Sequence, residues 1–382
     1  MQGDRIVSAG PSGRVSIPAK VDQTIDVAGL YVIPGLIDLH MHFTQQRGDD
    51  FSRYRDSDVA AAIRGVALLG QFVDGGITAV RDAGTANDVA IRIKEAVERR
   101  IFPGPRVFTS GALIASRGGH SDEITQTASG RPRSLDSSRT RVATGPDDWR
   151  LAVREQIRMG ADWIKLTAPY TREEVAAAVD EAHLHGIRVM ADAFGEFVDW
   201  GVEAGLDSVE HPLAIADEVV KKMASKGTGF VPTLTAFYNV FTYGYPPAGI
   251  PPGGFYYTLS RRFVFTHETN LHTVRLARSS GVKVGVGTDI PFENEKRYPS
   301  DYFVEMGFLK DAGFTPVEIL ASATRVGAEI LDMGDKLGTL EAGKIADVLV
   351  VSANPLEDHL NLKKLVLLVA DGRVVRDRRR EP

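Results

Sequence analysis

The chain has 382 residues, of which 43% are hydrophobic and 25% are charged, and its formal net charge is −5. This composition excludes the disordered and fibrous classes, and the interspersed charges give no reason to expect a nucleic-acid or membrane partner. The absence of cysteine excludes disulfides, thiolate metal sites and cysteine nucleophiles. Because the amino terminus carries no signal peptide and no apolar run approaches about 18 residues, we expect a cytoplasmic protein.

From about residue 36 onwards, short β-rich runs alternate with longer amphipathic patterns. The runs predicted as strands are Leu36–His42, Thr78–Asp82, Arg106–Thr109, Trp163–Thr167, Arg188–Ala193, Ser208–His211, Phe230–Thr235 and Lys283–Thr288. The segments predicted as helices are Asn87–Arg99, Asp147–Met159, Arg172–His185, Ala216–Lys226 and Phe263–Ser279. Glycines that end a helix before a strand are expected at Gly76, Gly160, Gly186, Gly205, Gly227 and Gly281. Eight strands alternating with helices predict an α/β fold and favour a closed (β/α)8 TIM barrel.

The two ends of the chain carry short β-type runs instead. These runs are Asp4–Ser8, Asp347–Ser352, Val366–Ala370 and Arg373–Arg376, with Asp371-Gly372 as a hairpin turn between the last two. We therefore expect residues 1–34 and 335–382 to form a small β-sandwich domain beside a barrel of residues 35–334.

One long irregular segment, from about Phe237 to Tyr257, follows the seventh predicted strand and carries eight aromatic residues. Its aromatic density argues against disorder. The segment is expected to form an apolar wall over a binding site, or to pack on the barrel rim or against another copy of the chain.

The strand ends carry the residues with chemistry, because active sites of such barrels lie at the carboxyl ends of the strands. His40 and His42 are two apart in a strand, so both imidazoles point into the barrel. The fourth strand carries Lys165, the sixth ends at His211 and the eighth at Asp289. Three histidines and an aspartate suit a divalent metal such as zinc. A buried lysine beside them is explained if its amine is neutral and carboxylated by CO2, which gives a carboxylate that bridges two metals.

Each of these features alone has a structural explanation. A His-x-His pair in a strand is often structural, a lone lysine often extends to solvent or pairs with a carboxylate, and Thr288-Asp289 could cap the next helix. Their coincidence at four strand ends indicates a metal site. The histidines expected at surface or structural positions are His183, His185, His267, His272 and His359.

These motifs make the sequence similar to the amidohydrolase superfamily. It resembles the binuclear metal-dependent branch, which includes imidazolonepropionase-like enzymes and proline-type dipeptidases. The resemblance rests on VIPGLIDLHMH at 32–42, GPRV at 104–107, GGH at 118–120, the strand of Lys165, Glu210-His211, GTD at 287–289 and GTLEAGKIAD at 338–347. It implies a (β/α)8 barrel with a β-sandwich, two divalent metals, and hydrolysis of amide or ester bonds by a metal-bound hydroxide. Relatives usually carry about two more strands before Gly3, so we expect a shortened leading part of the sandwich.

The resemblance also implies a role for each ligand. His40, His42 and Asp289 would hold the more buried metal, and carboxylated Lys165 would bridge to a second metal held by His211. Asp289 would accept the proton of the bridging water and return it to the leaving group. We therefore expect two divalent ions, in the first instance zinc, and a CO2-derived carboxylate on Lys165.

The fifth strand departs from the pattern of the superfamily, which ends it with a histidine ligand of the second metal in a run like Ala-His-Ala. This chain has MADAF at residues 190–194, with Asp192 at the position of the histidine. Three explanations stay open: a substitute oxygen ligand, an introduced inactivating change, or a natural variant with one metal or no activity. A negative ligand beside a bridging carboxylate should weaken the hydroxide as a nucleophile, so we expect reduced activity.

On the substrate side, the resemblance places the Gly118-Gly119-His120 loop at the pocket. His120 is expected either to polarise the scissile carbonyl or to bond to its neighbours in the loop. Arg117 and Tyr238 are candidates to meet a substrate carboxylate.

The sequence therefore predicts a metal-dependent hydrolase that cleaves the amide between an apolar acyl or aminoacyl group and an amino acid. One alternative is a carbamate, lactone, ester or organophosphate hydrolase on the same metals, and another is a catalytically silent binding homologue. The expected partner is a small-molecule substrate, and we expect the chain to form a homo-oligomer.

Overall fold

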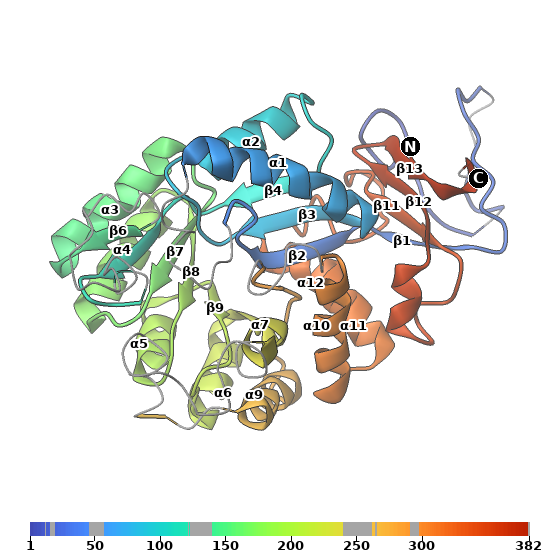
Figure 1. The fold of residues 1–382 in the computed structure, drawn as a ribbon. Helices are drawn as coiled ribbons and strands as arrows, with labels where there is room; N and C mark the ends of the chain where they lie inside the picture. Colours follow the sequence, from blue (N-terminus) through green and yellow to red (C-terminus); the bar gives the residue numbers. More distant parts are fainter. Residues whose placement is uncertain are drawn as a thin grey trace.

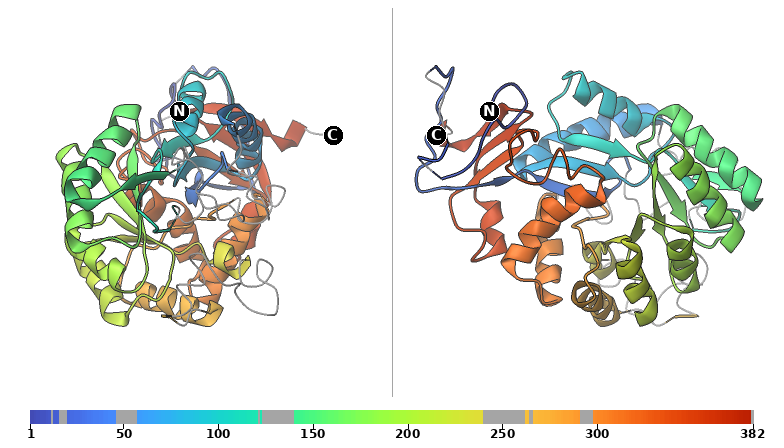
Figure 2. Two further views of the ribbon diagram at one scale, coloured as in Figure 1. Left: turned by 60° about the vertical axis from the view of Figure 1, so that its left-hand side comes forward. Right: turned by 180° about the vertical axis from the view of Figure 1, so that it is seen from behind.

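The computed structural model describes residues 1–11, 13–15, 20–45, 57–120, 122, 140–239, 262–263, 266–290 and 298–380. Helices surround a ring of mostly parallel strands, and a small antiparallel sheet lies beside this barrel with both chain termini near it (Figures 1 and 2). The α/β class, the TIM barrel and the sheet built from the two ends are thus as predicted.

Within the described residues, the barrel strands form one parallel group in the order β2-β3-β4 and a second in the order β10-β9-β8-β7-β5-β6. Their bounds are β2 Leu36–Met41, β3 Ile77–Asp82, β4 Arg106–Thr109, β5 Leu113–Ser116, β6 Thr140–Ala143, β7 Trp163–Thr167, β8 Arg188–Asp192, β9 Ser208–Glu210 and β10 Gly229–Val231. The third predicted strand, Arg106–Thr109, is β4, which pairs with β3. β5 and β6 were not predicted; β5 pairs with β7 and with β6.

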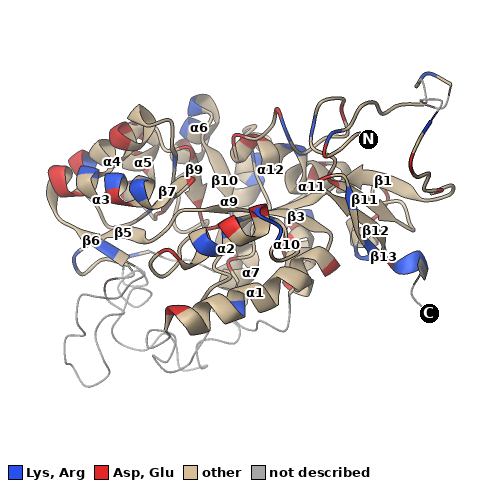
Figure 3. Cartoon of the chain, turned by 90° about the horizontal axis from the view of Figure 1, so that it is seen from above, with Lys and Arg blue, Asp and Glu red and all other residues tan. Residues whose placement is uncertain are grey.

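The helices lie outside the strands (Figure 2). They are α1 Asp58–Asp74, α2 Val89–Glu98, α3 Gly145–Met159, α4 Arg172–Leu184, α5 Glu196–Ala204, α6 Asp217–Lys226, α7 Leu234–Asn239, α9 His267–Ser279, α10 Ser300–Asp311, α11 Pro316–Ala323 and α12 Arg325–Ile330. Acidic and basic residues are mixed on the outer helices (Figure 3). For example, Arg154 of α3 donates to Glu181 of α4 at 2.7 Å. No helix in the described part of the chain has the length and apolar character needed to cross a membrane.

The predicted eighth strand closes the barrel without forming a regular ladder. Phe230 of β10 donates its N–H to Lys283 O at 2.8 Å, and Leu39 of β2 donates its N–H to Val286 O at 2.8 Å. A Cβ at Gly287 would lie 2.8 Å from His40 Cβ, so a glycine permits this close approach to β2. The segment at 283–290 therefore lies between the last and first strands, and it brings Asp289 beside His40.

The predicted helix-ending glycines have the expected backbone. Gly160, Gly205 and Gly227 end α3, α5 and α6 with φ of 104°, 101° and 75°. The seventh strand is shorter than predicted, because α7 begins at Leu234 where the strand was expected to continue to Thr235. In the predicted aromatic segment, only Phe237 and Tyr238 have described side chains.

The small sheet has the order β1-β11-β12-β13 and consists of β1 Tyr31–Pro34, β11 Val348–Val351, β12 Leu365–Ala370 and β13 Arg373–Asp377. The predicted strand at Asp4–Ser8 is reduced to isolated bridges that pair Arg5 with Gln2 and with Ile345. Arg106 of β4 donates to Asp347 at 3.0 Å, which fastens the barrel to this sheet. The domain limits at residues 34 and 335 stay a prediction.

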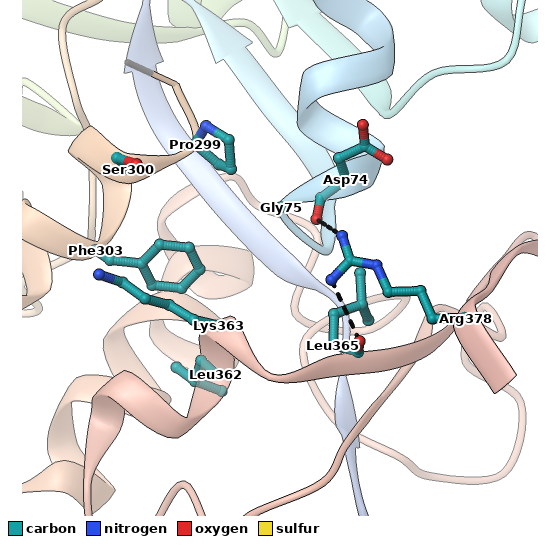
Figure 4. Close-up of a pocket in the computed structure, with 9 residues that line it drawn as sticks. All are labelled: Asp74, Gly75, Pro299, Ser300, Phe303, Leu362, Lys363, Leu365 and Arg378. Carbon is teal, nitrogen blue, oxygen red and sulfur yellow. Dashed lines mark hydrogen bonds between the residues drawn. The ribbon is translucent and has the colours of Figure 1, made fainter. Parts of the chain in front are cut away.

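A pocket of about 210 Å³ lies between the barrel and the small sheet (Figure 4). It is lined on one side by Pro299 and Phe303 and on the other by Leu365 and Arg378. Arg378 donates to the carbonyls of Asp74 and Leu365 across it. None of the residues predicted as metal ligands lines this pocket.

Candidate metal centre

The residues predicted as ligands come together at the carboxyl ends of the barrel strands. His40 lies in β2 and His42 directly after it, Lys165 in β7, Asp192 at the end of β8, His211 directly after β9, and Asp289 in the closing segment. One ligand atom each of His40, His211 and Asp289 lie within 4.8 Å of one another, and all three residues are buried.

Asp289 faces the two histidines of the first strand. Its Oδ1 lies 3.5 Å from His40 Nε2 and 3.3 Å from His42 Nε2. Burial raises the pKa of Asp289, but the facing imidazoles, that of His40 above all, outweigh burial and lower the pKa to about 2. The carboxylate is therefore ionised at neutral pH and could serve as a metal ligand or as a proton acceptor.

In each of three histidines, the second ring nitrogen, Nδ1, lies within hydrogen-bond distance of a neighbouring oxygen. Nδ1 of His40 lies 2.6 Å from Glu210 Oε2, Nδ1 of His42 lies 3.0 Å from the carbonyl oxygen of Gly84, and Nδ1 of His211 lies 2.6 Å from Thr233 Oγ1. Such contacts fix the orientation of a ligating imidazole. They leave the Nε2 atoms of His40 and His42 directed at Asp289.

Glu210 belongs to a buried network that the sequence did not reveal. Its Oε1 accepts from Arg81 Nη2 at 2.8 Å and from Ser208 Oγ at 2.6 Å, and Arg81 also donates to Leu39 O at 2.6 Å. Glu210, Arg81 and Ser208 have no exposed surface. Residues two apart in a strand share a face, so the positions of Ser208 and Glu210 could have indicated that both point into the barrel.

Backbone strain marks two of the predicted ligands. His211 and Asp289 have φ of 72° and 55°, in the left-handed region that side chains other than glycine seldom adopt. Neighbouring residues in a strand point to opposite faces, so the turn of the backbone at His211 lets both Glu210 and His211 approach the centre. Strain of this kind gathers at functional sites.

Lys165 is 2% exposed, and its Nζ lies 3.4 Å from His40 Nε2. Burial lowers the pKa of Lys165, although the carboxylates of Asp192 and Glu210 act in the opposite direction. This is the setting in which a lysine amine is readily deprotonated.

Asp192 lies between two histidines. Its Oδ2 is 3.3 Å from His120 Nε2 and 3.5 Å from His211 Nε2, whereas its buried Oδ1 has no hydrogen-bond partner. Burial raises the pKa of Asp192, but the facing imidazoles of His211 and His120 outweigh burial and hold it well below its ordinary value. Asp192, the residue that differs from the superfamily pattern, therefore lies in the centre.

The predicted substrate residues are more widely spread. Arg117 is exposed in the turn after β5. The ring of Tyr238 packs 5.1 Å from those of His267 and Phe308, whereas the ring of Phe237 lies 5.0 Å from that of His211. Of the two aromatic side chains described in this segment, Phe237 is the one that lies against the centre, and the sequence did not single it out from its neighbours.

Comparison with known proteins agrees with this geometry. A model of the amidohydrolase family matches residues 31–375. The chain belongs to the amidohydrolase family.

Two curated relatives support the assignment of this amidohydrolase. Ochratoxinase of Aspergillus niger is 27% identical over 361 residues, which cover 86% of this chain and 71% of that protein. Imidazolonepropionase of Cutibacterium acnes is 28% identical over 387 residues, which cover 96% of this chain and 86% of that protein. A solved Xaa-Pro dipeptidase with methionine bound in its active site is 28% identical, with a TM-score of 0.85 over 98% of this chain and 94% of that one.

Family membership makes the chain an enzyme that hydrolyses amide bonds of small molecules. Amidohydrolases generally bind metal, and the residues present fit a divalent ion. The buried cluster contains imidazole nitrogens and ionised carboxylates, which are the ligands that zinc prefers. The unpartnered Oδ1 of Asp192 is a further atom that a cation would satisfy.

Proposed function

We propose that this amidohydrolase cleaves the amide bond between an apolar acyl or aminoacyl group and an amino acid. It would use two divalent ions, for which zinc is our first candidate. The spacing of the ligand atoms is the observation that carries the proposal. Ligands that surround a tetrahedral ion at about 2.0 Å lie about 3.3 Å from one another. The Asp289 oxygen lies 3.3 and 3.5 Å from Nε2 of His42 and of His40. The Lys165 amine, which would bind through the oxygens of its carbamate, lies 3.4 Å from His40 Nε2.

His40, His42 and Asp289 would hold one ion, and Asp192 and His211 would contribute to the other. Lys165 would bridge the two after its amine forms an N–C bond to CO2 and releases a proton, which leaves a carbamate. When bound, the two ions would polarise the substrate carbonyl and lower the pKa of water to about 7. Asp289 would accept the proton of the attacking water and deliver it to the leaving nitrogen.

The substrate class is supported by the buried ring of Phe237 beside the centre and by the relatives. Phe237 presents its ring to His211, which suits an apolar group on the acyl side. The relatives include a dipeptidase whose active site holds an amino acid. Arg117 is our candidate for the substrate carboxylate because it is exposed, and Tyr238 is a second candidate. His120 would either polarise the scissile carbonyl or act on the ion beside Asp192.

A substrate panel with added zinc tests this proposal. It should contain N-acyl amino acids, dipeptides, carbamates, aryl esters, lactones and an organophosphate, and each should be assayed beside Asp289→Asn. We expect the highest kcat/KM for an amide of an amino acid with a free carboxylate. Faster hydrolysis of an ester, a lactone or an organophosphate than of every amide would contradict the proposal.

The aspartate at position 192 is the one observation behind the alternative of a silent binding homologue, and membership of a family of enzymes argues against that alternative. The alternative predicts that the chain holds no metal and hydrolyses nothing in the panel. Cytoplasmic location and homo-oligomeric assembly stay predictions, and sedimentation of the purified protein tests the latter.

A further inference from the structure

Three side chains from separate segments meet at the end of β8, which is the fifth strand predicted for the barrel. His120 follows β5, Asp192 ends β8 and His211 follows β9, and one oxygen of Asp192 faces an Nε2 atom of each histidine. From the sequence, His120 is expected to polarise the scissile carbonyl or to bond to its neighbours in the loop. Its position beside Asp192 indicates a third role.

Both imidazoles act as hydrogen-bond partners of the Asp192 carboxylate, but over distances that are long for such bonds. Nε2 of His120 and of His211 lie 3.3 and 3.5 Å from Asp192 Oδ2, whereas the hydrogen-bonded imidazoles of His40 and His211 lie 2.6 Å from Glu210 and Thr233. Charge-assisted bonds are ordinarily about 2.7–2.9 Å long. The longer separations equal the spacing of about 3.3 Å between ligands of one tetrahedral ion.

A second observation independently points to a cation. Asp192 is 7% exposed, and its Oδ1 has no hydrogen-bond partner. A buried carboxylate oxygen without a partner is costly, and coordination to an ion is one way to satisfy it.

His120 is also held in place by neighbouring structure. Its N–H donates to Ala168 O at 3.3 Å, and its carbonyl accepts from Thr167 Oγ1 at 3.0 Å, so the end of β7 fixes the loop. His211 is fixed by Thr233 on its other ring nitrogen. The backbone of His120 and the imidazole of His211 are thus held in place beside Asp192.

We propose that His120 is a ligand of the second ion and, together with Asp192 and His211, replaces the pair of histidines that the superfamily uses there. This inference rests on the proposed function for the existence of the second ion. Two histidines and one carboxylate form a known type of zinc site, in which a further position stays open. In this account the loop histidine compensates for the lost histidine of the fifth strand.

The ion content of His120→Asn, loaded with zinc and dialysed, tests the inference. The exposed His272 provides a matched control, His272→Asn. Elemental analysis and chelator competition should show two ions in the wild type and the control. In His120→Asn the second ion should bind more than about 100-fold more weakly, since even the loss of an outer partner of a ligand costs 10–100-fold, and the first should be unchanged. Absorption of the cobalt-loaded protein should lose the bands of one site only.

If His120→Asn lowers kcat but leaves the affinity for both ions unchanged, His120 acts on the substrate and the inference is wrong. A wild type that hydrolyses amides with one ion per chain would also overturn the inference, while leaving the hydrolase assignment intact. If no member of the panel is hydrolysed but His120→Asn still loses one ion, the proposed reaction fails and the ligand assignment holds. Should His120→Asn not fold, Asp192→Asn must lose the same ion.

Discussion

Glu210 Oε2 lies 2.6 Å from Nδ1 of His40, and neither side chain has any exposed surface. The other oxygen of Glu210 is occupied by Arg81 and Ser208. This contact joins β2 to β9 and fixes which ring nitrogen of His40 faces the centre. The orientation of His40, a predicted metal ligand, therefore depends on the barrel being closed.

The first prediction concerns this link. Glu210→Gln replaces one acceptor oxygen by an amide nitrogen, so either His40 or Arg81 loses its partner. We expect the affinity for the first ion to fall by about 10–100-fold. Chelator competition measures this, with the exposed Glu218→Gln of α6 as the control. Equal affinity in wild type and Glu210→Gln would show that Glu210 has no role in positioning His40.

Asp289→Asn should abolish the proton transfer and leave the fold intact. Asparagine tolerates the left-handed φ of 55° at this position, and the amide cannot accept the proton. We expect kcat to fall by at least about a thousandfold, with a change in Tm of less than about 3 °C. Steady-state kinetics and thermal unfolding measure the two quantities. A variant with more than about a tenth of wild-type kcat would rule out Asp289 as the proton acceptor.

Asp192→His restores the residue that the superfamily has at the end of the fifth strand. It removes one negative charge from the centre, which leaves the ions more able to polarise the substrate carbonyl. We expect kcat to rise by about tenfold, which corresponds to about 1.4 kcal/mol in the barrier. Turnover and elemental analysis of both proteins measure the effect. Equal turnover would mean that Asp192 does not impair the enzyme.

Glu305 gives a pH dependence of stability that is independent of the centre. Its carboxylate on α10 accepts from the N–H groups of Leu234 and Thr235 at the start of α7. Burial raises its pKa from 4.5 to about 7, so between these pH values the native state holds more protons than the unfolded state. The contribution of this group to the free energy of unfolding therefore falls as the pH rises through that window, by up to about 3 kcal/mol.

Urea unfolding in the presence of a chelator, at about pH 5 and about pH 7.5, measures this dependence. We expect Glu305→Gln to lose part of it, because burial also raises the pKa of Asp38 to about 7 and leaves a slope of the same sign. The exposed Glu98→Gln is the control. The same pH dependence in Glu305→Gln and in the wild type would exclude this role of Glu305.

Much of the fold could be predicted because its signals are local. The strand that ends at His40-Met41-His42 and the glycines after α3, α5 and α6 are visible as short patterns. β5 and β6 were missed because each is a run of only four residues. The early end of β10 was missed because Glu305, distant in sequence, provides acceptors at the start of α7.

The candidate metal centre was likewise predictable only in part. Its ligand types and their strand ends follow from residue spacing, whereas their partners depend on contacts between distant segments. The pairing of His40 with Glu210 spans 170 residues and exists only because the barrel closes. The approach of His120 to Asp192 depends on the anchoring of its loop at Thr167. Sequence patterns carry neither relationship.

A crystal structure of the zinc-loaded protein, with anomalous difference maps at the zinc edge, tests the two-ion centre most directly. We predict two peaks, one among His40, His42 and Asp289 and one among His120, Asp192 and His211. We also predict density for a carboxylate that continues from Nζ of Lys165. A single peak with no density beyond the Lys165 amine would contradict the account.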